Sequence, residues 1–171
     1  RRHELVSPES ALVCAVCAPP RPGSNKRIRG LLIAGVDWNK AVQTAYDHSL
    51  APLFCSRLLA SFTDRIPSDL RQAMQVHLDR HRARVGELNA ALLEIVSTLE
   101  SQGIRAVPFK GPTLAQWAFA DPALRLFYDL DILLQDADVE QGISCLLDLG
   151  YQHTGDFNPR REAALRRYGG Q

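Results

Sequence analysis

The sequence has no strong excess of charge and no long apolar run. Its 20 lysines and arginines nearly balance 19 aspartates and glutamates, and the formal net charge is +1. This balance gives no electrostatic reason to expect general attraction to nucleic acid or to an acidic membrane, although a local basic face could still bind RNA. Because no apolar stretch reaches the length that spans a bilayer, we expect no membrane partner.

Cysteine is also scarce. The four cysteines, Cys14, Cys17, Cys55 and Cys145, are scattered through apolar surroundings. This usage is typical of reduced thiols in a cytoplasmic protein rather than of a disulfide framework. Cys14 and Cys17 have a CxxC spacing, but no second pair has the spacing that a structural zinc site needs. We interpret them as small core residues on one side of a helix.

The remaining composition, 46% hydrophobic and 23% charged, is that of a globular protein with one domain or two small ones. Residues 1–102 are predicted to form a helical region. Helices are expected to begin at Pro8 and after Asp37. A further helical stretch is expected at residues 50–59. The proline-rich residues 19–24 are predicted to be a loop.

The clearest helix signal covers residues 68–102. Its stripe positions step by three or four along the chain and are Leu70, Met74, Leu78, His81, Val85, Leu88, Leu92, Ile95 and Leu99. We interpret this stripe as the core-facing side of a helix in an antiparallel bundle. A dimerising coiled coil is the alternative, but sustained charge pairs beside the stripe are absent. His77 and His81 have a metal-compatible spacing, but Leu78 stands where the zinc-protease pattern has glutamate.

After residue 102 the pattern changes, and residues 103–171 are predicted to form a small mixed-sheet core. The expected elements are a strand at 104–109, a helix at 112–119, a buried strand at 127–134, a helix capped by Asp136 and the start of a strand at 151–153. Strands and helices in this order are typical of small layered domains. Together with the helical region, they predict the α+β class.

Two aspartates carry the chemistry that this second segment predicts. Asp129 and Asp131 are two residues apart on the predicted strand, so their side chains are expected on one face of the sheet. Two unpaired carboxylates side by side are costly, and a divalent cation removes that cost. Mg²⁺ is usually held by one or two carboxylates together with substrate phosphates. The sequence therefore predicts that Asp129 and Asp131 bind Mg²⁺.

The turn at Gly111 is predicted to supply the other half of this site. It follows a predicted strand and precedes a helix, so free backbone N–H groups there can bind a phosphate. Thr113 adds a hydroxyl group in the first helical turn, and Lys110 and Arg125 are candidates for neutralising phosphate charge. Pro112 lacks an N–H group, which leaves the turn one donor fewer. We expect this turn and the two aspartates to open to the same cleft.

The loop and the acid pair, in this order, resemble the uncharacterised nucleotidyltransferase family of the DNA polymerase beta-like superfamily. They are also similar to the abortive-infection toxin-type nucleotidyltransferases, whose loop reads Lys-Gly-Gly-Thr. The specific match covers roughly residues 92–153. The residues that carry it are Lys110-Gly111-Pro112-Thr113-Leu114-Ala115, Arg125 and Asp129-Leu130-Asp131.

The resemblance implies Mg²⁺-dependent transfer of a nucleoside monophosphate from an NTP to an acceptor. Asp129 and Asp131 would be the catalytic metal ligands, and Gly111 with Thr113 the phosphate loop. The resemblance does not identify the base of the NTP. It also leaves the acceptor open among a protein, a tRNA and a small molecule.

The superfamily uses a third carboxylate on a later strand, and this sequence offers no clear residue for it. Asp148 lies on a predicted helix, and Asp156 lies in a loop after a glycine. We therefore expect either that the third acid lies beyond Gln171 or that the protein is a non-catalytic module that binds nucleotide or docks a partner. In either case the 171-residue chain alone should transfer no nucleotide. An unpartnered sheet edge would favour a homodimer.

Overall fold

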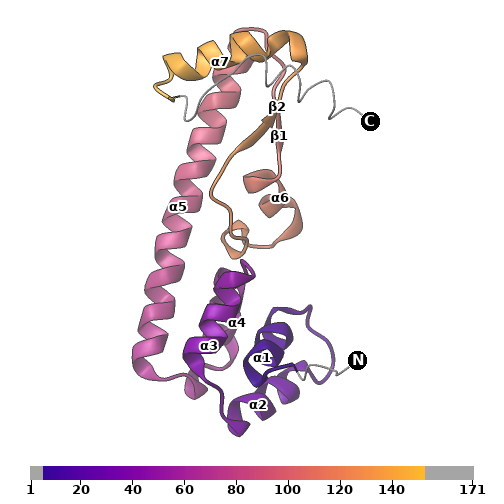
Figure 1. Cartoon of the computed structure of the whole chain (residues 1–171), viewed down its shortest axis with the longest axis vertical. Helices are drawn as coiled ribbons and strands as arrows, with labels where there is room; N and C mark the ends of the chain where they lie inside the picture. The colour runs from indigo at the N-terminus through magenta and orange to yellow at the C-terminus, as the bar shows by residue number, and fades with distance from the viewer. Residues whose placement is uncertain (1–5, 153–171) are drawn as a thin grey trace. The chain divides into compact units, whose positions relative to one another are not determined.

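A computed structural model describes residues 6–152 of the chain, and contacts divide them into two compact units. Within the described residues, the first unit comprises 6–93 and 108–132, and the second comprises 94–107 and 133–152. The domain boundary expected between residues 102 and 103 stays a prediction. Figure 1 labels the α-helices and the strands. In chain order the elements, with three short 3-10 helices (η), are α1 (Pro8–Cys17), α2 (Ser24–Ala34), α3 (Trp38–Asp47), α4 (Ala51–Ser61), η1 (Thr63–Arg65), α5 (Ser68–Ser101), β1 (Val107–Phe109), α6 (Gly111–Ala118), η2 (Pro122–Leu124), β2 (Asp131–Leu133), η3 (Asp136–Asp138) and α7 (Val139–Asp148).

Two helices of the first unit begin where the sequence predicts. The Ser7 hydroxyl accepts a hydrogen bond from the backbone N–H of Ser10 at the start of α1, and Pro8 is the first helical residue. The Asp37 carboxylate caps α3 by accepting from the N–H groups of two residues in its first turn. Caps of this kind satisfy backbone donors that a first helical turn leaves free.

The loop predicted at residues 19–24 is confirmed for residues 19–23, but the helix α2 that follows it was not predicted. Helix α2 begins after Gly23 and ends before Gly35, and both glycines have positive φ angles, of 84° and 89°. Only Ile28 of this helix is buried, so the apolar pattern that would have revealed it is almost absent. The helical stretch expected at residues 50–59 is α4, and Pro52 lies in its first turn, where a missing N–H group costs little.

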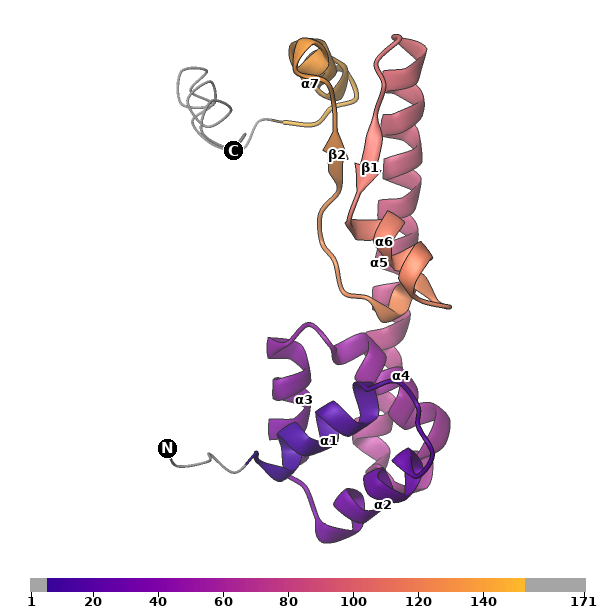
Figure 2. The same ribbon diagram turned by 90° about the vertical axis from the view of Figure 1, so that its right-hand side faces the viewer.

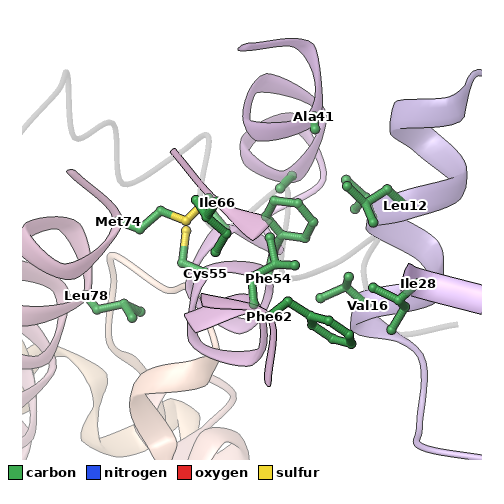
Figure 3. Close-up of a cluster of buried hydrophobic side chains, with 14 residues drawn as sticks. Leu12, Val16, Ile28, Ala41, Phe54, Cys55, Phe62, Ile66, Met74 and Leu78 are labelled. Carbon is green, nitrogen blue, oxygen red and sulfur yellow. The ribbon is translucent and has the colours of Figure 1, made fainter. Parts of the chain in front are cut away.

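The main apolar core of the first unit is built by α1 to α4 and the start of α5. Phe54 of α4 is fully enclosed, and Leu12 of α1 and Ala41 of α3 belong to the same cluster (Figure 3). Met74 and Leu78 add α5 to it. Because fully burying a leucine or phenylalanine stabilises the fold by about 1.5–3 kcal/mol, this cluster is expected to dominate the stability of the unit.

Helix α5 carries the predicted apolar stripe, and other segments of the same chain bury this stripe. Met74 and Leu78 lie in the first cluster, and Val85 and Leu88 lie in a second cluster with residues of the following segment. This burial supports the core-facing interpretation and removes the basis of the coiled-coil alternative. The helix ends as predicted at Gly103, whose φ angle is 77°.

Strands β1 and β2 lie side by side and run in opposite directions (Figure 1, Figure 2). They are the two strands of the sheet that the structure describes, and with the helices they confirm the α+β class. Between them, α6 and η2 pack on α5 through a cluster of buried residues. Its members are Val85, Leu88, Ala115, Ala123 and Phe127.

Both strands are shorter than predicted. The strand expected at 104–109 covers only Val107–Phe109, because the N–H group of Ile104 bonds to the Leu99 carbonyl and closes the end of α5. The strand expected at 127–134 covers only Asp131–Leu133, and Phe127 is buried in the cluster with α5. The end of α5 therefore replaces strand pairing at the beginning of the first segment, and tertiary packing replaces it at the beginning of the second.

The second unit closes around Gly142 of α7. A Cβ atom at this position would lie 2.6 Å from Leu134 Cδ1 and 3.7 Å from Leu99 Cδ2, so the glycine permits this close packing. Asp136 does not cap α7 as predicted, because the turn η3 precedes the helix and Asp138 is its N-cap. Of the strand expected at 151–153, the first two residues are in no strand, and His153 lies outside the described residues.

The four cysteines are free thiols. The interpretation of the first pair as core residues is wrong for Cys14, which is exposed, while Cys17 packs partly against the core. Burial raises the pKa of Cys17 to about 12 and that of Cys55 to about 11, so both thiols stay protonated and unreactive at neutral pH. The cytoplasmic location expected from cysteine usage stays a prediction.

None of the helices within residues 6–152 combines the length and the apolar character that crossing a bilayer requires.

Candidate functional site

The predicted phosphate turn is a sharp reversal between β1 and α6. Lys110 has a φ angle of 55° and Gly111 one of 37°, so two successive residues adopt positive φ. This conformation strains a residue with a side chain, and such strain is often stored at functional sites. The N–H group of Leu114 bonds to the Lys110 carbonyl and begins α6, which leaves N–H groups of the first turn available to a ligand.

Gly111 brings this turn into contact with the segment of the first aspartate. A Cβ atom on Gly111 would lie 3.1 Å from the Asp129 carbonyl oxygen and 4.0 Å from Phe127 Cδ2. A side chain at this position would therefore press on backbone, which cannot rotate away. Residues far apart in the sequence meet here because one of them is a glycine.

The two aspartates differ in their surroundings. Asp131 begins β2 and is half-buried, and its Oδ2 atom lies 3.9 Å from Lys110 Nζ. Asp129 is exposed and lies in the irregular segment before β2, outside the strand in which it was predicted. That both carboxylates face one cleft with the Gly111 turn stays a prediction, but the turn and the acid pair are neighbours.

Arg125 is bound to the turn rather than pointing freely into solvent. Its guanidinium donates a hydrogen bond of 3.3 Å to the Gly111 carbonyl and lies over the Phe127 ring, 5.8 Å from the ring centroid. One of its five N–H donors is used in this way. Its predicted role in binding phosphate therefore depends on the remaining donors and is untested.

His81 was not predicted to be part of the site, and it supports Arg125. Its side chain is buried, and its Nε2 atom donates to the Arg125 carbonyl over 3.2 Å. Arg82, the next residue, forms an ion pair of 3.6 Å with Asp121 before η2. These two contacts hold η2, which lies between Asp121 and Arg125, against α5. The polar interruption of the stripe at His81 was the only sequence signal of this contact.

A second histidine lies behind the first. The His77 ring stacks on the His81 ring with 6.4 Å between the centroids, and its Nδ1 atom lies 2.8 Å from the Tyr46 hydroxyl. Burial, and secondarily the charge of His81, lower the pKa of His77 below its usual value. A series of contacts therefore runs from the Arg125 carbonyl through His81 and His77 to Tyr46 of α3.

Thr113 is exposed in the first turn of α6, where the sequence places it. It forms part of the lining of a shallow groove with a volume of about 240 Å³. The rest of the lining is Pro108, Phe109, Lys110, Leu114 and Trp117. The groove therefore begins at the predicted phosphate turn.

The carboxylates suit a metal that arrives with phosphate better than a metal held by the protein alone. Among residues 6–152, no group of three or more histidine, cysteine, aspartate or glutamate side chains could hold a metal ion. Asp129 and Asp131 still provide two oxygen donor groups, the number that Mg²⁺ commonly takes from a protein when phosphates complete its coordination. The donor set therefore fits an Mg²⁺–nucleotide complex.

The third carboxylate is not supplied by the described part of the later chain. Asp148 is the last residue of α7, as its helical prediction requires, and Asp156 lies outside the described residues. The site therefore consists, in the described chain, of the turn at Gly111, the acid pair and the contacts of Arg125.

Comparisons with known proteins agree with this reading at the level of the family. No curated protein and no solved structure matches the chain. A family model described as uncharacterised nucleotidyltransferase matches residues 34–169, and it extends further into the helical region than the motif resemblance at residues 92–153. This span covers well over half of the chain and includes the turn, Arg125 and both aspartates. The chain therefore belongs to the uncharacterised nucleotidyltransferase family.

Proposed function

We propose that the Gly111 turn and the two aspartates bind an NTP together with Mg²⁺, and that this site serves the transfer of a nucleoside monophosphate to an acceptor. Family membership supports nucleotidyl transfer as the reaction class. The observation that carries the proposal is the meeting of two segments: Gly111 lies against the Asp129 backbone, and Lys110 Nζ lies 3.9 Å from Asp131 Oδ2.

The reaction would be a substitution at the α-phosphorus of the NTP. An acceptor hydroxyl oxygen bonds to this phosphorus, the bond to the oxygen that bridges the α- and β-phosphates breaks, and pyrophosphate leaves. The hydroxyl proton passes to a nearby base or to water. When bound, Mg²⁺ would supply positive charge to the phosphate oxygens.

The residues of the chain would act mainly by positioning and by neutralising charge, as in other phosphoryl transfers. N–H groups at the start of α6 would hold a phosphate oxygen, and Thr113 would add a hydroxyl donor. Lys110 would neutralise phosphate charge as a mobile point charge. Arg125 would keep the turn in place through the Gly111 carbonyl.

The test compares two pairs of aspartates with the same spacing. Asp129→Asn/Asp131→Asn should abolish Mg²⁺-dependent binding of ATP and GTP in calorimetry, because charge rather than shape holds the metal. Asp136→Asn/Asp138→Asn, in η3, should leave binding unchanged. Circular dichroism checks that both variants are folded. Equal nucleotide affinity in the wild type and the first variant would refute the metal-binding role.

A non-catalytic module is the second candidate. The observation in its favour is that the described residues contain no third ligand beside the acid pair. Such a module would bind nucleotide with Mg²⁺ and dock a partner through its helices, without transfer. The acceptor, whether a protein, a tRNA or a small molecule, and the homodimer are untested predictions in both cases.

A further inference from the structure

Exposed apolar side chains gather in the groove beside the phosphate turn. Phe109 ends β1, and Leu114 and Trp117 follow on α6. Trp117 is 85% exposed and Phe109 46% exposed. Large apolar side chains that cluster in one exposed place commonly mark a binding surface. The groove is therefore suited to a ligand with a flat apolar part.

Lys110 joins this groove to the acid pair. Its Nζ atom lies 5.0 Å from the centroid of the Phe109 ring and 3.9 Å from Asp131 Oδ2. The cation thus stands between an apolar surface and the proposed metal-binding carboxylates. A ligand that uses both sides must combine an anionic end with a planar apolar end. A nucleotide has this division, whereas inorganic phosphate would leave the groove empty.

We propose that the groove formed by Phe109, Leu114 and Trp117 binds the base of the NTP, which stacks on the exposed aromatic rings. This inference rests on the proposed function. Trp117 lies six residues after Gly111, or about 9 Å along the helix axis, so the base would lie beyond the phosphates. The volume of about 240 Å³ is below the usual range for a complete ligand pocket, and it suits one planar ring system.

The same lining predicts little selectivity among bases. Its side chains are mostly apolar, and only those of Lys110, Thr113 and Trp117 carry hydrogen-bonding groups. Stacking on aromatic rings is tolerant of sequence because every base has a π-face. We therefore expect ATP, GTP, CTP and UTP to bind with affinities that differ by only a few-fold.

The experiment uses Trp117 as its own reporter. The chain has two tryptophans, so Trp38→Phe leaves Trp117 as the only one. Titration with each Mg²⁺–NTP should quench its fluorescence, whereas Mg²⁺–tripolyphosphate, which lacks a base, should bind in calorimetry without comparable quenching. Calorimetry of the wild-type protein provides the same comparison of ligands without a substitution in the core.

Substitutions distinguish the contribution of the base to binding from that of the phosphates. Trp117→Ala should weaken binding of every NTP about tenfold and leave tripolyphosphate binding unchanged, and Trp117→Phe should retain most of the affinity. Leu93→Ala, which removes another exposed apolar side chain (72% exposed), is the matched control and should change neither.

Each contrary outcome has a distinct meaning. If NTPs bind but Trp117→Ala does not weaken them, the inference about the groove is wrong while the proposed function stands. If Trp117→Ala lowers only transfer to an acceptor, the groove holds the acceptor and the inference is also wrong. If neither NTP nor tripolyphosphate binds to the wild-type protein, the proposed function fails together with the inference.

Discussion

At the scale of single residues, Gly111 meets two requirements at once. Its φ angle of 37° disfavours any residue with a side chain, and a Cβ atom would lie 3.1 Å from the Asp129 carbonyl oxygen. Gly86, in the middle of α5, meets neither requirement, because its φ angle is not positive and nothing lies within 4 Å of its Cβ position. The two glycines therefore form a natural comparison.

We predict that Gly111→Ala lowers the free energy of unfolding by about 1–3 kcal/mol, through backbone strain and the close contact. Gly86→Ala should raise it by about 0.5–1 kcal/mol, because alanine is the better helix former. Urea denaturation measures both changes. A Gly111→Ala protein as stable as the wild type would contradict the close approach of the turn to Asp129.

His77 gives the second residue-scale prediction, which concerns pH. Its pKa is lowered in the folded protein, first by burial and then by His81. The unfolded chain therefore binds the proton more readily, and stability is complete above the ordinary histidine pKa of about 6.5 and falls as pH drops below it.

The melting temperature should accordingly decrease from pH 7 to pH 5, and His77→Phe should reduce this decrease because the titrating group is gone. Thermal unfolding followed by circular dichroism at both pH values measures the effect. An unchanged pH dependence in His77→Phe would show that other groups cause it.

At the scale of elements, the sequence predicts what depends on neighbours along the chain. The caps Ser7 and Asp37 bond to residues two or three positions away, and the stripe of α5 repeats every three or four residues. Helix α2 and the start of β2 depend on tertiary packing instead. Phe127 enters a cluster with α5, and this contact leaves no local pattern, whereas the bond from Ile104 to Leu99 is local and was missed.

The candidate site divides in the same way. The turn at Gly111 and the aspartates could be recognised because their order and spacing form a motif. The contact between His81 and Arg125 joins residues 44 positions apart, and only the polar residue in an apolar stripe hinted at it. The bond from Arg125 to the Gly111 carbonyl was likewise not predictable, because it fixes a turn rather than forming a motif.

His81 provides the element-scale prediction. His81→Leu removes the donor to the Arg125 carbonyl, so η2 and the Gly111 turn should lose part of their anchoring to α5. We expect NTP affinity to fall several-fold and the free energy of unfolding to fall by about 1 kcal/mol. His81→Gln, which keeps an N–H donor, should restore part of the affinity, and His48→Leu, at an exposed position, serves as control. Calorimetry showing full NTP affinity in His81→Leu would contradict the anchoring role.

At the scale of the whole molecule, we expect the chain to bind an NTP without transferring its nucleotide. The turn, Lys110 and the two aspartates are expected to bind an NTP, but a metal pair held by two carboxylates lacks an anionic ligand for the transition state. We predict that the 171-residue chain binds Mg²⁺–ATP and labels no acceptor when incubated with radiolabelled NTP.

The same assay on Asp156→Asn tests the exception. Labelling by the wild-type chain that is lost in this variant, while NTP binding is kept, would show that Asp156 completes the site. Labelling that survives the substitution would place the missing acid elsewhere and would still contradict the prediction of no transfer.

The ion pair between Lys110 and Asp131 implies an exchange of partners when ligands bind. Without nucleotide, the ammonium group occupies the place of a cation beside Asp131, 3.9 Å from its Oδ2 atom, and so competes with Mg²⁺. A triphosphate would draw Lys110 away and release the carboxylate, so each ligand should raise the affinity for the other by the same factor. Mg²⁺ should therefore bind more weakly alone than with a saturating NTP, and Lys110→Met should narrow this difference in calorimetry. Equal Mg²⁺ affinity with and without NTP would exclude the exchange. In this exchange Lys110 is a placeholder that offsets one of the two carboxylate charges until the phosphates of the ligand draw it away.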